Sequence, residues 1–202
     1  MHTLYYVPGA CSLCPHIVLH EAGLAFRLDK VDPKTKVTES GRDYNAINPK
    51  GYVPALTMSN GELLTEVAVI VQYLADQAPA RQLAPQAGTA ARYHLMECLN
   101  FIATEIHKGF GPLFNPKLPE DARPVLKERL MLRLGAAARM LEGKDYLMGS
   151  HFSVADAYFY TVLRWASYLN VDLSVLPVLQ AYLERIAARP AVKAALAEEG
   201  LQ

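Results

Sequence analysis

The feature that most constrains the fold is a change of hydrophobic pattern near residue 80. Before it, short stretches that alternate apolar and polar residues, such as 26–31, are separated by stretches with helical spacing, such as 12–22. After it, apolar residues recur only at helical spacing. Alternation is typical of half-buried strands, whereas recurrence every three to four residues is typical of amphipathic helices. The pattern therefore predicts a small α/β domain followed by an all-α domain.

The first 80 residues predict the element order β-α-β-α-β-β-α. Strands are expected at 2–7, 26–31, 53–58 and 62–64, and helices at 12–22, near 43–48 and from Thr65 onward. The turn Ser59-Asn60-Gly61 predicts a hairpin between the last two strands, because Asn-Gly tolerates the backbone angles of tight turns. Two prolines and a glycine in residues 79–88 indicate a linker, so the domains are placed at 1–80 and 89–202.

Four helices are predicted after the linker. Their apolar faces include Leu95, Leu130 and Leu179 in the first, second and fourth. The third begins at Ser153, where an acid three residues later (Asp156) has the spacing of a capping box. Pro190 is expected to end the fourth helix, because the residue before a proline disfavours helical angles.

Composition excludes several classes of function. The chain has 202 residues, 51% of them apolar, and its 20 basic and 20 acidic residues cancel. A dedicated nucleic-acid binder normally carries a basic excess, and a disordered chain has few apolar residues. No secretory signal or apolar run of membrane-spanning length is visible, so neither a nucleic-acid nor a membrane partner is expected. Three cysteines are too few for a disulfide scaffold, which favours a reducing, cytoplasmic location.

The pair Cys11 and Cys14 is the strongest chemical signal. It lies where the first predicted strand passes into the first predicted helix. A helix N-terminus offers free N–H groups and a positive dipole end, which stabilise a thiolate. Cys11 is therefore predicted to have a pKa below that of a free cysteine. Two cysteines at this spacing inside a β-α-β pattern are also a redox signature.

Three further positions have open readings. Pro54 could begin an edge strand, or it could follow a cis peptide bond and present the backbone of Val53 to an extended ligand. Glu66 could complement a helix dipole or hold a ligand ammonium beside N–H groups that hold a carboxylate. His16 and His20 are four residues apart, but no further ligand joins them in the sequence, so no metal site is predicted.

Seven segments together resemble the beta-class bacterial glutathione S-transferases. They span nearly the whole chain in family order: 4–17, 48–56, 64–66, 99–101, 105–108, 112–115 and 153–157. The resemblance implies a thioredoxin-like N-terminal domain, an all-helical C-terminal domain and a homodimer. It implies a detoxifying enzyme that conjugates glutathione to small hydrophobic electrophiles, with glutathione as co-substrate and no prosthetic group. Cysteine-dependent thiol–disulfide exchange is implied as a further activity.

The resemblance also assigns roles to residues. Cys11 corresponds to the active-site cysteine beside the glutathione sulfur, and His107 lines the cleft near it. The positions that correspond to glutathione-binding residues are Lys36, Val53, Pro54, Glu66, Val67, Asn100, Glu105 and Lys108. Of these, Asn100 and Glu105 correspond to residues that reach glutathione in the neighbouring subunit. Ser153 and Asp156 correspond to a structural helix cap.

Two departures from the family pattern keep alternatives open. Cys14 replaces a serine or other small residue, and it is either a neutral replacement or a resolving thiol. Val67 stands where many relatives have serine or glycine, so only its backbone N–H can bind the ligand there. The alternatives are a glutathione-linked disulfide reductase that uses Cys11 and Cys14, and a non-catalytic glutathione-binding module. The sequence does not identify the electrophile, nor whether conjugation or thiol exchange is the main activity.

Overall fold

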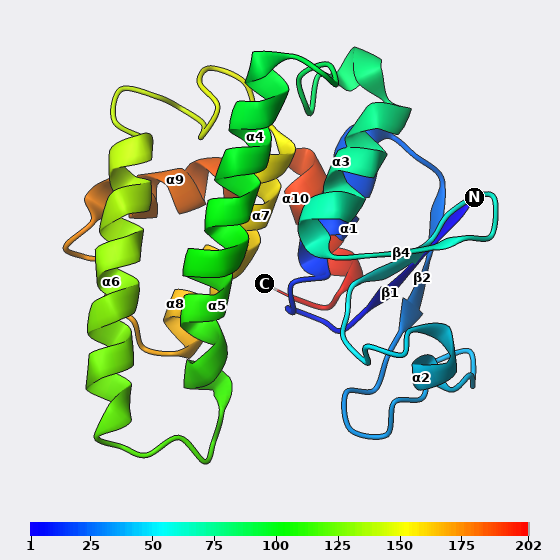
Figure 1. The fold of residues 1–202 in the computed structure, drawn as a ribbon, viewed down its shortest axis with the longest axis horizontal. Coiled ribbons are helices and arrows are strands. Elements are labelled where there is room, and N and C mark those ends of the chain that lie inside the picture. The colour runs from blue at the N-terminus through cyan, green and yellow to red at the C-terminus, as the bar shows by residue number, and fades with distance from the viewer. Residues whose placement is uncertain (202) are drawn as a thin grey trace.

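Four strands form one sheet in the order β2-β1-β3-β4 in the computed structural model, which describes residues 1–201 (Figure 1). The strands are β1 (His2–Tyr6), β2 (Phe26–Lys30), β3 (Ala55–Thr57) and β4 (Leu63–Thr65). β1 runs parallel to β2 and antiparallel to β3. β3 and β4 pair antiparallel around Gly61, whose φ of 90° and N–H bond to the Met58 carbonyl close the turn. The hairpin predicted from Asn-Gly is confirmed.

Each face of the sheet is covered by helices. Successive side chains of a strand point to opposite faces, and β1 follows this rule. Leu4 and Tyr6 belong to the large core that includes α1 (Leu13–Ala22) and α3 (Val67–Gln77). Tyr5 belongs to a small second core with Tyr44 of α2 (Tyr44–Ile47), whose ring lies 5.7 Å away. The alternating pattern of the first strand thus explains why helices lie on both faces.

The rest of the chain is helical. After a 3-10 turn, η1 (Pro79–Arg81), the elements are α4 (Ala90–Phe101), η2 (Ile102–His107), α5 (Lys108–Phe110), η3 (Gly111–Phe114), α6 (Ala122–Met140), α7 (Val154–Leu163), α8 (Trp165–Tyr168), α9 (Pro177–Ala187) and α10 (Pro190–Glu198). Segment η2 is π-helical and continues α4 without a break. The α/β fold with an all-helical C-terminal part is the fold that the sequence predicted.

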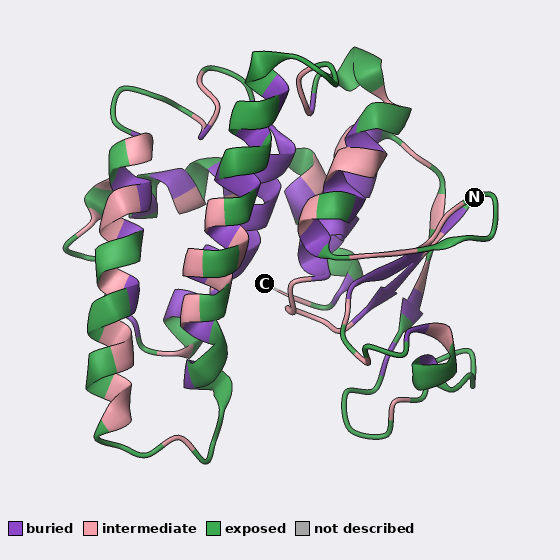
Figure 2. Cartoon of the chain, in the orientation of Figure 1, coloured by how far each residue is buried: buried purple, intermediate pink, exposed green. Residues whose placement is uncertain are grey.

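Helix α7 is the centre of the helical part. Every residue of α7 is buried, and Figure 2 shows the buried surfaces of the surrounding helices turned toward it. Its predicted capping box is present: Asp156 Oδ2 accepts hydrogen bonds from the N–H and the Oγ of Ser153, both at 2.8 Å. Asp156 Oδ1 accepts from Leu147 N–H at 2.8 Å and from the Tyr182 hydroxyl at 2.9 Å. Burial raises the pKa of Asp156, and these hydrogen bonds oppose that rise.

Helix α9 ends at Ala187, before Pro190, as predicted, but a further helix that the sequence did not predict, α10, begins at Pro190. Pro190 is the first residue of α10, a position where its missing N–H costs no hydrogen bond. The helix packs along α1, so the C-terminus returns to the first domain (Figure 1). Arg189 precedes α10 and makes two hydrogen bonds to the carboxylate of Glu21, at 2.6 and 3.0 Å. This ion pair joins the two ends of the chain.

The start of α3 differs from the prediction by one residue. Thr65 is the last residue of β4, and Glu66, with a φ of 71° and a ψ of 119°, is the cap of the helix. Thr65 therefore does not cap α3 as predicted, because the hairpin pairing extends through it. Among residues 1–201, no helix is long and apolar enough to cross a bilayer.

Candidate functional site

Two adjoining cavities lie between the sheet and the helical part, and Cys11, Tyr52 and Val53 line both. We call them the polar cavity, of about 640 Å³, and the apolar cavity, of about 580 Å³. The polar cavity is further lined by Asn48, Lys50, Pro54, Thr65, Glu66, Val67, Ala103, His107, Lys108 and Tyr158. The apolar cavity is further lined by Val7, Pro8, Gly9, Ala10, Val31, Pro33, Lys36, Gly51, Phe114, Trp165, Tyr168 and Leu201.

Cys11 lies in the turn before α1 with a protonated thiol. Its Sγ donates a hydrogen bond to the Val53 carbonyl at 3.2 Å. Burial raises the pKa of Cys11 to about 12, although its own N–H and that of Ser12 act in the opposite direction. The prediction of a lowered pKa is therefore wrong for the free protein. The helix N-terminus does stabilise a thiolate here, but loss of hydration among the residues that line the cavities outweighs it.

Alkylation against pH tests this result. Because the thiol stays protonated, iodoacetamide should modify Cys11 slowly at neutral pH, with a rate midpoint above the value of about 8.5 for a free cysteine. Peptide mapping by mass spectrometry would follow Cys11 separately from Cys14 and Cys98, which are buried. A midpoint at or below 8.5 would show that the N-terminal N–H groups dominate over burial.

Cys14 is not poised to react. Its side chain belongs to the main core and is 0% exposed, and burial raises its pKa well above the usual range. Both Cys11 and Cys14 are free thiols in the structure. A resolving thiol must reach a mixed disulfide as a thiolate, so a fully buried, protonated Cys14 favours the neutral replacement among the two readings.

The peptide bond between Val53 and Pro54 is cis, which decides between the two readings of Pro54. Both residues line the polar cavity, and β3 begins directly after them. The carbonyl oxygen of Val53 accepts a hydrogen bond from the thiol of Cys11, so the backbone at this point faces the Cys11 side chain. This arrangement supports the role that the sequence expected for Val53.

Glu66 and Val67 form one end of the polar cavity. Val67 begins α3, an 11-residue helix whose first N–H groups have no partner within the helix. Glu66 adopts its positive φ at that point, and residues held in such sparsely populated regions cluster at ligand sites. Lys50 donates to Glu66 Oε1 at 2.9 Å and to Thr65 Oγ1 at 3.1 Å. A carboxylate and a helix start with free N–H groups therefore lie side by side in the lining of this cavity.

His107 lies on the opposite wall of the polar cavity. The π-helical turn of η2 places it there, followed by Lys108, and such turns are frequent at functional sites. Its Nδ1 lies 2.7 Å from the hydroxyl of Tyr158, and its ring meets Trp165 edge-on at 5.0 Å. Burial, with a smaller contribution from the charge of Lys108, lowers the pKa of His107 to about 4. The imidazole is therefore neutral at physiological pH.

The remaining predicted residues lie away from the polar cavity of their own chain. Lys36 lines the apolar cavity, and its Nζ donates a hydrogen bond to the carbonyl oxygen of Gly51 at 2.9 Å. Gly51 directly follows Lys50 in the sequence. Asn100 is exposed near the end of α4. Glu105 forms an ion pair with Arg133 at 2.8 Å. Neither Asn100 nor Glu105 lines either cavity.

Lys50, Tyr158 and Trp165 are among the lining residues that the sequence did not predict. Lys50 stands within the resembling segment 48–56, but its pairing with Glu66 depends on the hairpin bringing the two together. Tyr158 lies two residues after Asp156 on a helix that is buried all round, so no periodicity distinguishes it. Trp165 donates its Nε1–H to the Gly9 carbonyl at 2.9 Å, across 156 residues. Trp165 is the one tryptophan of the chain, and this rarity was the signal in the sequence that could have singled it out.

Known proteins match this chain over its whole length. The family models for the glutathione S-transferase N-terminal and C-terminal domains match residues 10–77 and 101–190. Glutathione S-transferase GstA of Escherichia coli O157:H7 is 47% identical, with 98% of this chain and 99% of that protein covered. A sphingomonad glutathione S-transferase in complex with glutathione and the beta-class enzyme of Sphingomonas chungbukensis each share 46% identity and a TM-score of 0.95. Both alignments cover 99% of this chain and 100% of theirs.

Fold and site together are those of a thioredoxin-like domain joined to a helical domain, with a cysteine at the cleft between them. The chain belongs to the glutathione S-transferase family. Within it, the similarity is to the bacterial beta class, as the sequence predicted.

Proposed function

We propose that this protein binds glutathione in the polar cavity and transfers it to a small hydrophobic electrophile in the apolar cavity. The observation that carries the proposal is that Cys11 and Val53 line both cavities. A thiol held beside Cys11 therefore faces the space where an apolar molecule can lie. The related sphingomonad structure, described as a complex with glutathione, supports the choice of thiol.

Glutathione fits the polar cavity by its charges. Its γ-glutamyl carboxylate would accept hydrogen bonds from the first N–H groups of α3, beginning with Val67, and its ammonium would face Glu66. Its cysteinyl backbone would pair with Val53. The glycyl carboxylate would lie toward Lys36 and Lys50, while Lys108 adds positive charge on the helical side.

Conjugation needs little from the protein beyond a stabilised thiolate. The bound thiol loses its proton to water, its sulfur forms a bond to the electrophilic carbon, and the leaving group departs with its electron pair. The N–H groups of Cys11 and Ser12, which already act to lower the pKa of Cys11, are suited to stabilise the ligand sulfur. His107 would contribute hydrogen bonding and shape rather than charge, because its low pKa keeps it neutral.

Thiol–disulfide exchange is the second activity that the site supports. Cys11, as the thiolate, can attack the glutathionyl sulfur of a mixed disulfide between glutathione and a substrate thiol, which forms Cys11–glutathione disulfide and releases the substrate thiolate. A second glutathione thiolate then attacks that disulfide, restores Cys11 and leaves as glutathione disulfide. The burial of Cys14 favours this monothiol route over a Cys11–Cys14 disulfide reductase. Rates of aryl-halide conjugation and of glutathione-dependent disulfide reduction, measured separately, test the proposal. A protein that binds glutathione but accelerates neither reaction would be the non-catalytic module.

Replacing Glu66 with glutamine should weaken glutathione binding by about 1–3 kcal/mol, the contribution of a hydrogen bond to a charged group. The amide cannot offset the positive charge of Lys50, so the ligand ammonium would meet uncompensated charge. Titration calorimetry measures the affinity. Glu62→Gln is the matched control, because Glu62 is exposed and lies outside both cavities. Equal affinities for Glu66→Gln and the parent would place the γ-glutamyl site elsewhere.

The proposal includes a homodimer in the cytoplasm in which Asn100 and Glu105 reach the glutathione site of the partner subunit. Large apolar side chains are exposed on the neighbouring surface of α3 and α4: Val69 at 46%, Tyr93 at 63% and Met96 at 43%. These residues line one shallow hollow between the two helices. An exposed apolar patch of this kind supports an interface between chains, and two-fold dimers are the commonest soluble assembly.

Sedimentation velocity at micromolar concentration should give the mass of a dimer. Met96→Glu should produce monomers, because it adds a charge to the apolar patch. If Asn100 and Glu105 act across the interface, those monomers should also bind glutathione more weakly than the parent dimer. A Met96→Glu monomer with undiminished glutathione affinity would exclude a shared site.

A further inference from the structure

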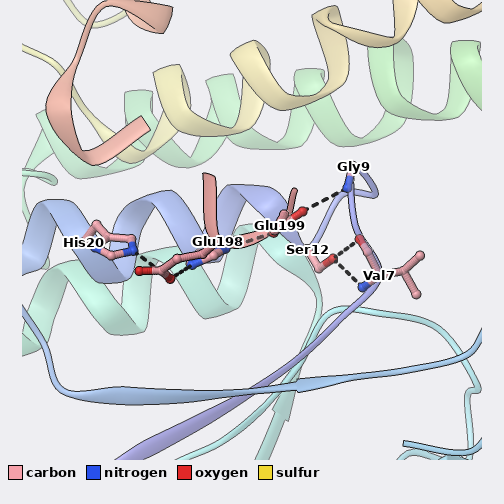
Figure 3. Close-up of polar contacts among 7 residues, drawn as sticks. Val7, Gly9, Ser12, His20, Glu198 and Glu199 are labelled. Carbon is pink, nitrogen blue, oxygen red and sulfur yellow. Dashed lines mark hydrogen bonds and ion pairs between the residues drawn. The ribbon is translucent and has the colours of Figure 1, made fainter. Parts of the chain in front are cut away.

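Two histidines of α1 and a glutamate of α10 meet at the contact between these helices (Figure 3). His16 and His20 are one helical turn apart and so lie on the same face of α1. Glu198, in the last turn of α10, directs Oε2 at both: it is 2.8 Å from His16 Nε2 and 3.2 Å from His20 Nε2. The expectation that no further ligand joins the two histidines was wrong, because the third comes from 178 residues further along the chain.

His16 presents both of its ring nitrogens to carboxylates at the contact between α1 and α10. The imidazole is 0% exposed and lies between two carboxylates, with Nδ1 2.9 Å from Glu199 Oε1 and Nε2 facing Glu198. An imidazole can face two carboxylates in two ways: it donates a hydrogen bond to each, or it donates from one nitrogen and binds a cation with the other. Glu199 is itself fully buried and also accepts the Gly9 N–H at 2.9 Å, which places it as the partner of Nδ1–H. In the second arrangement the Nε2 lone pair and the Glu198 carboxylate bind the same cation.

The surroundings match those of metal-binding histidines. Such histidines usually donate their other ring N–H to a carboxylate, as His16 does to Glu199 in this arrangement. Phe26 of β2 packs its ring edge-on against both imidazoles, at 5.5 and 5.1 Å, and so restricts their orientation. The side chains of His20 and Glu198 are 22% and 44% exposed, so an ion can enter and keep a water as a further ligand.

The ligand atoms of the three residues lie within 4.8 Å of one another, and the two histidine–glutamate distances need only a small adjustment. Tetrahedral ligands with bonds of about 2.0–2.1 Å lie about 3.3 Å apart. The observed separations of 2.8 and 3.2 Å reach that value if Glu198 moves outward by about half an ångström, which its exposure permits. We propose that His16 Nε2, His20 Nε2 and the Glu198 carboxylate bind one divalent transition-metal ion of the zinc type. Two imidazole nitrogens favour such an ion over magnesium or calcium, which prefer oxygen ligands.

An ion at this position would fasten the C-terminal helix to the helix that follows Cys11. Glu199 links the metal ligand His16 to the Gly9 N–H, and the Gly9 carbonyl accepts from Trp165. Gly9 lines the apolar cavity. The site is therefore separate from the cleft but shares a wall with it. Metal binding should raise the thermal unfolding temperature, because an ion that binds only the folded chain stabilises it.

Calorimetric titration of the chelator-treated, dialysed full chain with zinc chloride tests the site. One ion should bind per chain, and the cobalt derivative should show d–d bands without sulfur-to-cobalt charge transfer. His20→Ala and Glu198→Gln should each lower the affinity by more than tenfold, and Glu199→Gln by about 10–100-fold through the orientation of His16. The His20 and Glu198 side chains are partly exposed, so the first two variants should fold.

His94→Ala is the matched control. His94 pairs with Glu97 at 3.3 Å on the surface of α4, outside the three-ligand cluster, and its loss should leave zinc affinity unchanged. Cys11→Ser should likewise bind zinc as the parent does. Undiminished binding in His20→Ala and Glu198→Gln, a thiolate charge-transfer band, or no saturable binding would each overturn the proposal.

Discussion

Cys11→Ser should abolish glutathione-dependent disulfide exchange while leaving glutathione affinity largely unchanged. Exchange requires a sulfur–sulfur bond between the enzyme and glutathione, which a hydroxyl cannot form. Conjugation should survive, because the N–H groups near the ligand sulfur remain and serine still offers a hydrogen-bond donor. Parallel steady-state assays of the two reactions, with calorimetric affinity for glutathione, measure the separation.

Cys14→Ala and Cys98→Ala are the controls for this variant. Both residues are buried, at 0% and 3% exposure, and should keep both activities apart from modest losses of stability. Loss of exchange in Cys14→Ala with conjugation intact would support the dithiol reductase instead. Full exchange activity in Cys11→Ser would remove Cys11 from the mechanism altogether.

Asp156→Ala should have the largest effect on stability, lowering the free energy of unfolding by about 3–5 kcal/mol. The substitution leaves the Ser153 N–H and Oγ, the Leu147 N–H and the Tyr182 hydroxyl without their acceptor in a buried site. Each orphaned donor costs about 1–3 kcal/mol, although such costs are not fully additive. Urea unfolding at a fixed chain concentration measures the difference.

Asp121→Ala provides a matched comparison for the helix cap. Asp121 is the cap residue of α6, and Asp156 is part of the capping box of α7. Unlike Asp156, Asp121 is exposed, and its side chain makes no capping hydrogen bond within the described residues. Its replacement should change the free energy of unfolding by less than about 0.5 kcal/mol. A loss below 1 kcal/mol for Asp156→Ala would show that the chain around Leu147 and Tyr182 rearranges to satisfy these donors.

The elements that the sequence predicted depend on local interactions. The alternation in β2, the Asn-Gly hairpin and the Ser153–Asp156 capping box all follow from side chains within a few residues of one another. The position of Cys11 before a helix is likewise local. The family resemblance extended these observations to Val53, Glu66 and His107, and the structure brings all three to one cavity with Cys11.

Two features depended on the tertiary structure. The pKa of Cys11 is set by how much water the surrounding protein excludes, and not by its position before α1 alone. The partners of His16 come from α10, whose start at Pro190 has the same local signal as a helix end. Burial and pairing of this kind arise only when distant segments pack, because desolvation and ligand geometry depend on which atoms surround a group rather than on which residues precede it. The sequence by itself thus determined the strands, most of the helices and the position of Cys11 before a helix, and packing decided the protonation of Cys11 and the histidine–glutamate cluster.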